Sequence, residues 1–128
     1  MLIWSDSMTT RRSSAFRTLT SADYRAEVEA GMTEKDFQAL VLGLARGHGW
    51  LVYHPYDSRR SVMGYPDLTL VHPEHGFLWL ELKTMKGVVS PHQVVWHEAI
   101  RAAGGRSYIV RPSDMQLITG LLTGSREE

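Results

Sequence analysis

The chain has 128 residues and no cysteine, so it has room for one domain with a single core and can hold neither disulfides nor a thiolate zinc site. Its 14 basic and 14 acidic residues balance, so bulk charge does not indicate a nucleic-acid partner, and any such interaction must depend on local geometry. The lack of thiols fits the cytoplasm, and the apolar residues of segment 1–10 are broken by Ser and Asp, so neither a signal peptide nor a membrane partner is expected.

Residues 1–32 carry Ser/Thr-rich stretches and little periodicity, which predicts a mobile or loosely attached N-terminal arm in which 22–30 can form a short helix. The domain proper is expected over 33–124, followed by a tail at 125–128. It begins with a helix capped by Thr33 and Asp36 that ends at Gly47 or Gly49. The apolar face of this helix consists of Phe37, Leu40, Val41 and Leu44.

A short β-rich run at 50–54 is followed by a polar loop, 55–64, that contains two neighbouring arginines, Arg59 and Arg60. Two further strands, 67–71 and 77–83, flank a turn segment that reads as a five-residue hairpin connection, 72–76. These two strands are therefore expected to pair antiparallel.

Ser90, Pro91 and Gln93 form the start of a second helix, which runs to the Gly104-Gly105 stop. Its apolar stripe is expected to be Trp96, Ala99, Ile100 and Ala103. A fourth strand at 107–110 precedes a last helix, capped by Ser113 and Gln116. That helix carries Leu117, Ile118, Leu121 and Leu122. The element order αβββαβα predicts an α/β fold.

The hairpin register brings two carboxylates together. If the turn is centred on Glu74, paired residues have numbers that add up to 148, as Asp67 and Glu81 do. Directly opposed residues on antiparallel strands have Cβ atoms about 4.5–5.5 Å apart on one face of the sheet. Lys83 shares the face of Glu81 because alternate residues point the same way. The opposite face is the predicted core and carries Leu68, Leu70, Leu78, Leu80 and Leu82.

Two facing carboxylates on a half-buried strand repel each other unless a cation lies between them or one of them takes up a proton. Oxygen ligands favour Mg²⁺ or Mn²⁺ over zinc. Such an ion can polarise a phosphodiester, and a nearby ammonium group can orient the attacking water, so the pattern indicates a phosphodiesterase. The plainer alternative is that Asp67 caps a strand and Glu81 pairs with Lys83 on a solvated face. The register and the leucine backing favour the catalytic interpretation.

These motifs resemble a known family. Tyr65-Pro66-Asp67 followed by Glu81-Leu82-Lys83 is similar to the PD-(D/E)XK nuclease signature, and αβββαβ is the core order of that restriction-endonuclease-like fold, a mixed central sheet flanked by helices. The segment 64–68 and the run Ser90-Pro91-His92-Gln93 with Trp96 further resemble the VRR-NUC (virus-type replication-repair nuclease) group. The resemblance covers roughly 33–114.

The resemblance implies roles for individual residues. Asp67, Glu81 and the main-chain carbonyl of Leu82 would bind Mg²⁺ or Mn²⁺, Lys83 would position the attacking water, and Gln93 would complete the site from its helix. Nucleases of this kind often add an acid from the first helix. Glu34 is the best match, with Asp36 and Gln38 as alternatives, although a first-turn acid also suits a helix N-terminus by itself.

The resemblance also implies a DNA endonuclease acting on Holliday-junction or other branched DNA, working as a homodimer in a bacterial or phage-infected cell. A replication-linked or restriction-type nickase is an alternative. A catalytically inactive nucleic-acid-binding module is another, but it would be expected to have lost Asp67, Glu81 or Lys83.

Phosphate contacts are expected from a small set of basic residues, although exposed arginine pairs are often merely solvated. The candidates are Arg59, Arg60, Lys86 and Arg111. The histidines share no ligand spacing, so His48, His72 and His75 are expected to be solvated, while His54 and His92 lie nearer the predicted site. Trp96 is expected to be a core residue.

Overall fold

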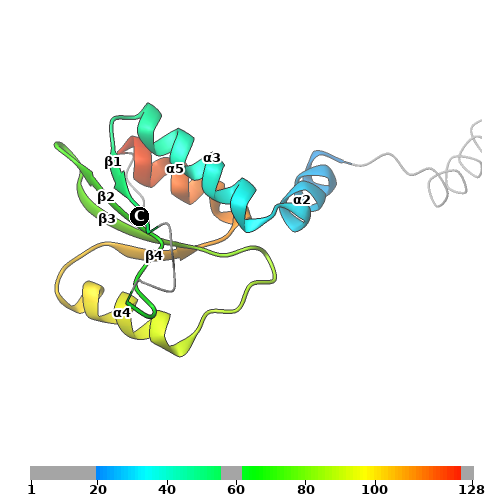
Figure 1. Cartoon of the computed structure of the whole chain (residues 1–128). Helices are drawn as coiled ribbons and strands as arrows, with labels where there is room; N and C mark the ends of the chain where they lie inside the picture. Colours follow the sequence, from blue (N-terminus) through cyan, green and yellow to red (C-terminus); the bar gives the residue numbers. More distant parts are fainter. Residues whose placement is uncertain (1–19, 56–61, 125–128) are drawn as a thin grey trace, which may run out of the picture.

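The computed structural model describes residues 20–55 and 62–124, which form a four-stranded mixed sheet with helices on both faces (Figure 1). The predicted α/β fold and its element order are confirmed. The helices are α2 Ser21–Gly31, α3 Glu34–Gly47, α4 Pro91–Ala102 and α5 Met115–Thr123, with a short 3₁₀ turn, η2 Pro112–Asp114, before α5. The strands are β1 Leu51–Tyr53, β2 Leu68–His72, β3 Gly76–Leu82 and β4 Ser107–Val110.

The strands lie in the order β1-β2-β3-β4, and only the β3–β4 pair is parallel. In the hairpin, Leu68 pairs with Leu80 and Leu70 with Leu78, which is the predicted register. The turn is shorter than predicted, because His72 and Gly76 still pair and three residues connect the strands. Gly76 has a positive φ of 77°, which closes a short hairpin at little steric cost.

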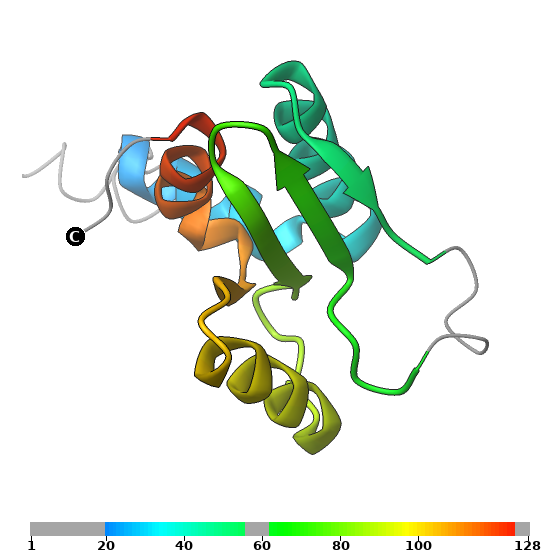
Figure 2. The ribbon, with the colours of Figure 1, turned by 90° about the vertical axis from the view of Figure 1, so that its left-hand side faces the viewer.

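Helices α3 and α5 lie side by side on one face of the sheet, behind the β2–β3 hairpin in Figure 2. They bury the leucine face of the strands, as predicted. Trp50 is buried in this core, and its indole N–H donates a hydrogen bond to the carbonyl oxygen of Leu122 at 2.8 Å. The sheet contributes Leu68, Leu70, Leu78, Leu80, Leu82 and Val110 to the core, and the helices contribute Phe37, Val41, Ala45, Ile118, Leu121 and Leu122.

Two details of the helical faces differ from the sequence prediction. Leu40 is 44% exposed, and Ala45 takes the buried position on α3 instead. Helix α5 starts after η2, so its N-cap is Asp114 rather than Ser113. The Asp114 carboxylate accepts a hydrogen bond from the backbone N–H of Arg111 at 2.8 Å, which fixes the entry into η2.

Helix α4 lies on the other face of the sheet, where the predicted stripe is wrong in part. Ala99 and Ala103 are exposed, and within Pro91–Ala102 the buried residue is His97. The imidazole Nδ1 of His97 makes a short hydrogen bond to Ser107 on β4. Burial, with a smaller contribution from nearby Arg101, lowers the pKa of His97 to about 4, so the ring is neutral at pH 7. A neutral polar pair therefore anchors α4 to the sheet.

A helix does form inside the expected N-terminal arm. Thr20 and Asp23 make a reciprocal capping box at the start of α2, and no residue of Ser21–Gly31 is buried. Residues 1–19 of the expected arm, the Arg59-Arg60 pair and the C-terminal tail lie outside the described residues. None of the described helices is long and apolar enough to cross a membrane.

Candidate active site

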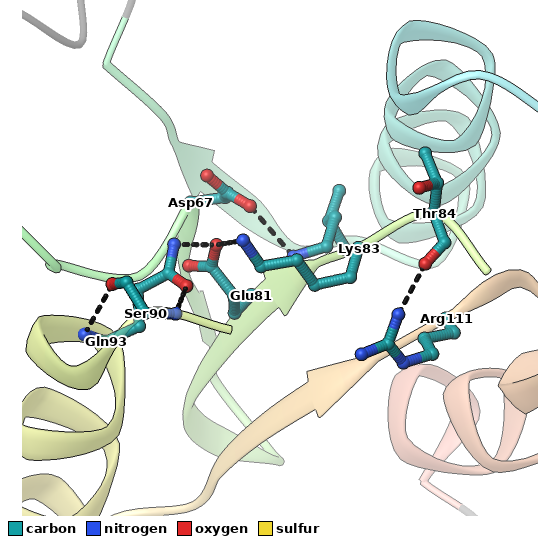
Figure 3. Close-up of polar contacts among 8 residues, drawn as sticks. Asp67, Glu81, Lys83, Thr84, Ser90, Gln93 and Arg111 are labelled. Atoms are coloured by element: carbon teal, nitrogen blue, oxygen red, sulfur yellow. Dashed lines mark hydrogen bonds and ion pairs between the residues drawn. The ribbon is translucent and has the colours of Figure 1, made fainter. Parts of the chain in front are cut away.

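The hairpin register places Asp67 and Glu81 opposite each other at one end of the sheet (Figure 3). Asp67 directly precedes β2, and Glu81 lies near the end of β3, beside the parallel strand β4. Pro66, which is buried, leads the chain into this position. The site thus forms where an antiparallel and a parallel strand meet β3.

Glu81 is 2% exposed, and one of its carboxylate oxygens has two polar neighbours. Its Oε2 accepts a hydrogen bond from the Gln93 side-chain amide at 2.6 Å and lies 3.7 Å from the Lys83 ammonium nitrogen. Its Oε1 is buried and has no hydrogen-bond partner within residues 20–55 and 62–124. A buried carboxylate oxygen without a partner is costly, so this atom is available to a cation or a proton.

Asp67 is held by the backbone of the opposite strand. Its Oδ2 accepts a hydrogen bond from the N–H of Leu82 at 2.8 Å. The Leu82 carbonyl belongs to the same stretch of chain, directly after Glu81, while its side chain lies in the core. The backbone at Leu82 therefore fixes the carboxylate of Asp67 relative to that of Glu81.

The two carboxyl groups have raised pKa values. Burial is the largest cause for Glu81, the Asp67 charge adds to it, and the Lys83 ammonium opposes it, with the result that the pKa of Glu81 rises to about 8. Burial also raises the pKa of Asp67, although the Leu82 N–H and the charges of Lys83 and His54 counteract part of the rise. In the absence of a cation, the pair therefore retains a proton at neutral pH.

Gln93 joins the site through the start of α4. Its side-chain oxygen accepts from the N–H of Ser90 at 2.9 Å, and its own N–H donates to the Ser90 hydroxyl at 3.2 Å. This capping box leaves the amide NH₂ group directed at Glu81. One side chain thus both caps α4 and contacts Glu81.

Comparison with known proteins decides the family. The sequence model of the VRR-NUC domain matches residues 25–114, most of the chain. The chain belongs to the VRR-NUC family. A solved structure described as a VRR-NUC domain is 26% identical to it, with a TM-score of 0.56 over 70% of this chain and 92% of that one. A comparison with curated protein sequences found no match. Membership identifies a nuclease-type domain, and it confirms the family resemblance of the sequence motifs.

The side chains of this VRR-NUC domain suit a divalent metal ion. The Glu81 oxygen without a partner and the Asp67 carboxylate are hard oxygen donors on facing residues, which is the donor type that Mg²⁺ and Mn²⁺ prefer. Burial raises the pKa of both carboxyl groups, the charge of Asp67 raises that of Glu81 further, and a bound cation would offset both effects. The site residues present thus fit such an ion.

The acid expected from the first helix makes no contact with this pair in the described part of the chain. Glu34 is exposed in the first turn of α3 and makes no hydrogen bond or ion pair with Asp67 or Glu81 in the described part of the VRR-NUC chain. Asp36 is also exposed, while Gln38 is half-buried. Their participation stays a prediction.

The basic residues expected to contact phosphate differ in their surroundings. Lys86 is exposed and lies four residues before Ser90, the N-cap residue of α4. Arg111 is half-buried, and its guanidinium donates to the carbonyls of Thr84 at 2.6 Å and Met85 at 3.4 Å (Figure 3). Arg111 therefore holds the backbone that follows Lys83. Arg59 and Arg60 lie outside the described residues.

Three positioning contacts in this VRR-NUC domain were missed in the sequence analysis. One is the Arg111 contact, which joins segments 26 and 27 residues apart and leaves no local signal. Another is the buried His97, which anchors α4 behind Gln93. The spacing of four residues between Gln93 and His97 places both on one helix face and could have indicated it. Tyr65 likewise links β2 and β3, since its hydroxyl contacts Thr69 at 2.8 Å and accepts from the Trp79 indole at 3.1 Å.

Proposed function

We propose that this domain is an Mg²⁺- or Mn²⁺-dependent endodeoxyribonuclease that hydrolyses phosphodiester bonds in branched DNA such as a four-way junction. The observation that carries the proposal is the buried Glu81 oxygen without a partner, facing Asp67 and flanked by Lys83. A set of carboxylates with one ammonium group is suited to metal-assisted phosphodiester hydrolysis. Retention of all three side chains argues against an inactive binding module.

Each residue of the proposed active site would have its own role in hydrolysis. Asp67, Glu81 and the Leu82 carbonyl would hold the metal, which would polarise the phosphodiester and lower the pKa of an attacking water. The Lys83 ammonium, half-buried beside Glu81, would orient that water or offset the negative charge that develops on the phosphate. Gln93 would fix the rotamer of Glu81 through its 2.6 Å hydrogen bond.

Binding of DNA would depend on local basic residues, because the net charge is zero. Lys86 is exposed and lies close in sequence to Lys83, so it suits a phosphate contact. Arg59 and Arg60 are proposed to add such contacts from the loop before Asp67. Arg111 would contribute mainly by holding the Thr84 carbonyl, with its remaining N–H groups free for phosphate.

A homodimer is part of the proposal. The face of the sheet that carries Glu81 also carries an apolar row across three strands, since Leu51 pairs with Val71 and Val71 with Phe77. Leu51 is 73% exposed and Phe77 58% exposed. An exposed apolar row of this kind favours an interface, and two copies related by a two-fold axis would supply the two incisions that junction resolution needs.

We further propose that residues 33–124 form the catalytic unit, with 1–32 as an attached arm, and that the protein acts in the cytoplasm of a bacterium or a phage-infected cell. The family match begins at residue 25, inside α2, so the second half of α2 also belongs to the matched region.

The direct test is cleavage of matched DNA substrates that share one sequence: duplex, flap, single strand and four-way junction, each with Mg²⁺, Mn²⁺ or EDTA. The expected result is metal-dependent cleavage with a preference for the junction. Preferential nicking of duplex would instead favour the replication or restriction-type nickase. Binding of the junction without cleavage under any metal would show that the catalytic proposal is wrong.

A further inference from the structure

The tip of the β2–β3 hairpin gathers three side chains that the proposed nuclease chemistry does not use. One nitrogen each of His72 and His75 and a carboxylate oxygen of Glu74 all lie within 4.8 Å of one another. The two imidazole rings stack, with centroids 4.3 Å apart and planes at 25°. These histidines were expected to be separate and solvated, but both are half-buried and in contact. The short turn brings them together because His72 still pairs with Gly76.

We propose that His72, Glu74 and His75 bind a transition metal of the Zn²⁺ type at this hairpin tip. Two imidazole nitrogens and one carboxylate oxygen form a donor set that suits Zn²⁺, with water completing a tetrahedral site. Hard ions such as Mg²⁺ prefer oxygen ligands only, so they would select the Asp67–Glu81 pair instead. The two sites would therefore take different metals, and the hairpin site does not depend on the nuclease proposal.

Polar contacts around His72 match those of a metal-ligating histidine. Its Nε2 lies 3.1 Å from the His48 carbonyl oxygen, so an Nε2–H group can donate to it, and Nδ1 is then the nitrogen that carries the lone pair. Nδ1 now accepts the backbone N–H of Glu74 at 3.0 Å. A metal at Nδ1 would displace that hydrogen bond, and because Glu74 is exposed, water can take its place.

Gly124 leaves room for the imidazole ring of His75. Gly124 has a φ of 85°, and a Cβ at this position would lie 2.3–3.0 Å from three atoms of the His75 imidazole. Trp50 packs on both rings, with its centroid 5.1 Å from His72 and 5.8 Å from His75. The Arg106 guanidinium donates to the His75 carbonyl at 2.5 Å and fixes the backbone there. The two imidazoles are thus held before any metal binds.

Two helix ends add a favourable electrostatic field for a cation. His48 is the C-cap residue of α3, and its carbonyl oxygen contacts His72, while Gly124 is the C-cap residue of α5 and contacts His75. The C-terminal end of a helix carries partial negative charge and stabilises cations within its last turn. A metal at the hairpin tip would lie near both ends and would tie the hairpin to α3 and α5.

The distances require a modest closure of the site. Zn²⁺ bonds to nitrogen and oxygen at about 2.0–2.2 Å, so ligand atoms of a tetrahedral site lie about 3.3 Å apart. The present limit of 4.8 Å must therefore shrink by up to about 1.5 Å, which rotation of the exposed Glu74 side chain and small turns of the two rings can supply.

The test is calorimetric titration of the full chain with Zn²⁺, in the presence of excess Mg²⁺ to occupy the carboxylate pair. One Zn²⁺ per chain is expected, and Glu81→Gln should bind it equally well. Glu74→Gln and His75→Asn should each weaken binding by at least about tenfold, because each removes a ligand. His48→Ala is the matched control, since its main-chain carbonyl remains, and it should bind like the wild type.

Thermal unfolding provides an independent readout. Zn²⁺ should raise the midpoint temperature of the wild type and of Glu81→Gln, but not that of His75→Asn, because a ligand that binds only the folded state stabilises it. Glu74→Gln changes an exposed turn residue, so it keeps the test valid even if a histidine variant folds poorly. Absence of Zn²⁺ binding by the wild type, or binding that is lost in Glu81→Gln and kept in the hairpin variants, would overturn the proposal.

Discussion

At the scale of single residues, the site is governed by one buried carboxyl group. Glu81 is enclosed, faces Asp67, and keeps one oxygen without a partner in the part of the chain that the structure describes. Burial and the neighbouring charge raise its pKa to about 8, whereas an unperturbed glutamate has a pKa of 4.5. The folded, metal-free protein therefore holds a proton that the unfolded chain has released at neutral pH.

This difference predicts how stability depends on pH. The free energy of unfolding of the metal-free protein should fall as the pH rises from 4.5 towards about 8, by up to about 1.4 kcal/mol per pH unit. Glu81→Gln cannot release the proton, so it should remove most of this slope and raise stability at pH 7. Urea unfolding in EDTA at several pH values measures both. If the stability of Glu81→Gln fell with pH as steeply as that of the wild type, the assigned pKa shift of Glu81 would be wrong.

Glu81→Gln and Asp67→Asn should also abolish cleavage while the fold is retained, because each removes a proposed metal ligand. Metal-dependent stabilisation should disappear in both variants. Junction cleavage and thermal unfolding with and without Mn²⁺ are the measurements. If either variant cut DNA at close to the wild-type rate, the site assignment would be wrong.

Lys83 should affect rate and leave metal affinity largely intact. Its ammonium lies 3.7 Å from Glu81 but donates to the reacting groups in the proposed mechanism and does not ligate the metal. Lys83→Ala should lower the single-turnover rate by about 10²- to 10³-fold, the usual cost of losing one group that stabilises transition-state charge. Calorimetry with Mn²⁺ should show binding close to that of the wild type. Lys86→Ala removes an exposed lysine three residues away that is proposed to contact phosphate, so it should weaken DNA binding but leave the single-turnover rate at saturating DNA close to that of the wild type.

The opposite pattern for Lys83→Ala, in which Mn²⁺ affinity is lost while cleavage persists, would reverse the roles given to Lys83 and the carboxylates. A loss of rate in Lys86→Ala as large as that in Lys83→Ala would point instead to a general effect of positive charge on DNA binding.

At the scale of secondary-structure elements, the start of α4 connects folding to the site. Ser90 and Gln93 make the reciprocal capping box, and the Gln93 amide also donates to Glu81. Each of Ser90→Ala and Gln93→Ala should destabilise the protein by about 0.5–2 kcal/mol through the lost cap. Only Gln93→Ala removes a hydrogen bond to the ionised carboxylate, so only this variant should raise the pKa of Glu81 further.

Metal binding requires deprotonated ligands, so the two cap variants can be separated by titrating Mn²⁺ affinity against pH. Gln93→Ala should need a higher pH than the wild type to reach the same affinity, whereas Ser90→Ala should follow the wild-type curve. Identical curves for the two variants would show that Gln93 acts on the site through the helix cap alone.

The elements also show what the sequence could predict. The register of β2 and β3 was correct, because strand alternation and a turn centred on Glu74 leave one pairing that puts all five leucines on one face. The stripe of α4 was wrong in part, because His97 is buried against Ser107, a partner on a later strand that periodicity does not reveal. The Arg111–Thr84 contact was missed for the same reason, whereas the His72–His75 stack was missed because the turn is shorter than predicted.

At the scale of the whole molecule, α3 and α5 cover one face of the sheet, and α4 lies on the other face. The row of Leu51, Val71 and Phe77 lies on this second face, which also carries Glu81, and Leu51 and Phe77 are exposed. The proposed catalytic carboxylates and this apolar row therefore face the same side. An interface on the row would bring two catalytic sites to one side of a dimer, where a branched DNA could contact both.

A charge placed in the middle of this row should separate the dimer without unfolding the monomer. Phe77 is 58% exposed, so Phe77→Lys costs little core packing but would bury an unpaired ammonium in the interface. Leu40→Lys is the matched control, since Leu40 is 44% exposed on α3, on the opposite side of the sheet. Light scattering at micromolar concentration should give twice the chain mass for the wild type and Leu40→Lys, and a monomer for Phe77→Lys.

The monomer should still hydrolyse single phosphodiester bonds, because each chain has a complete set of proposed catalytic residues, but it should nick four-way junctions instead of cutting two strands. A wild-type protein that is monomeric under these conditions and binds a junction as one copy would exclude the dimer.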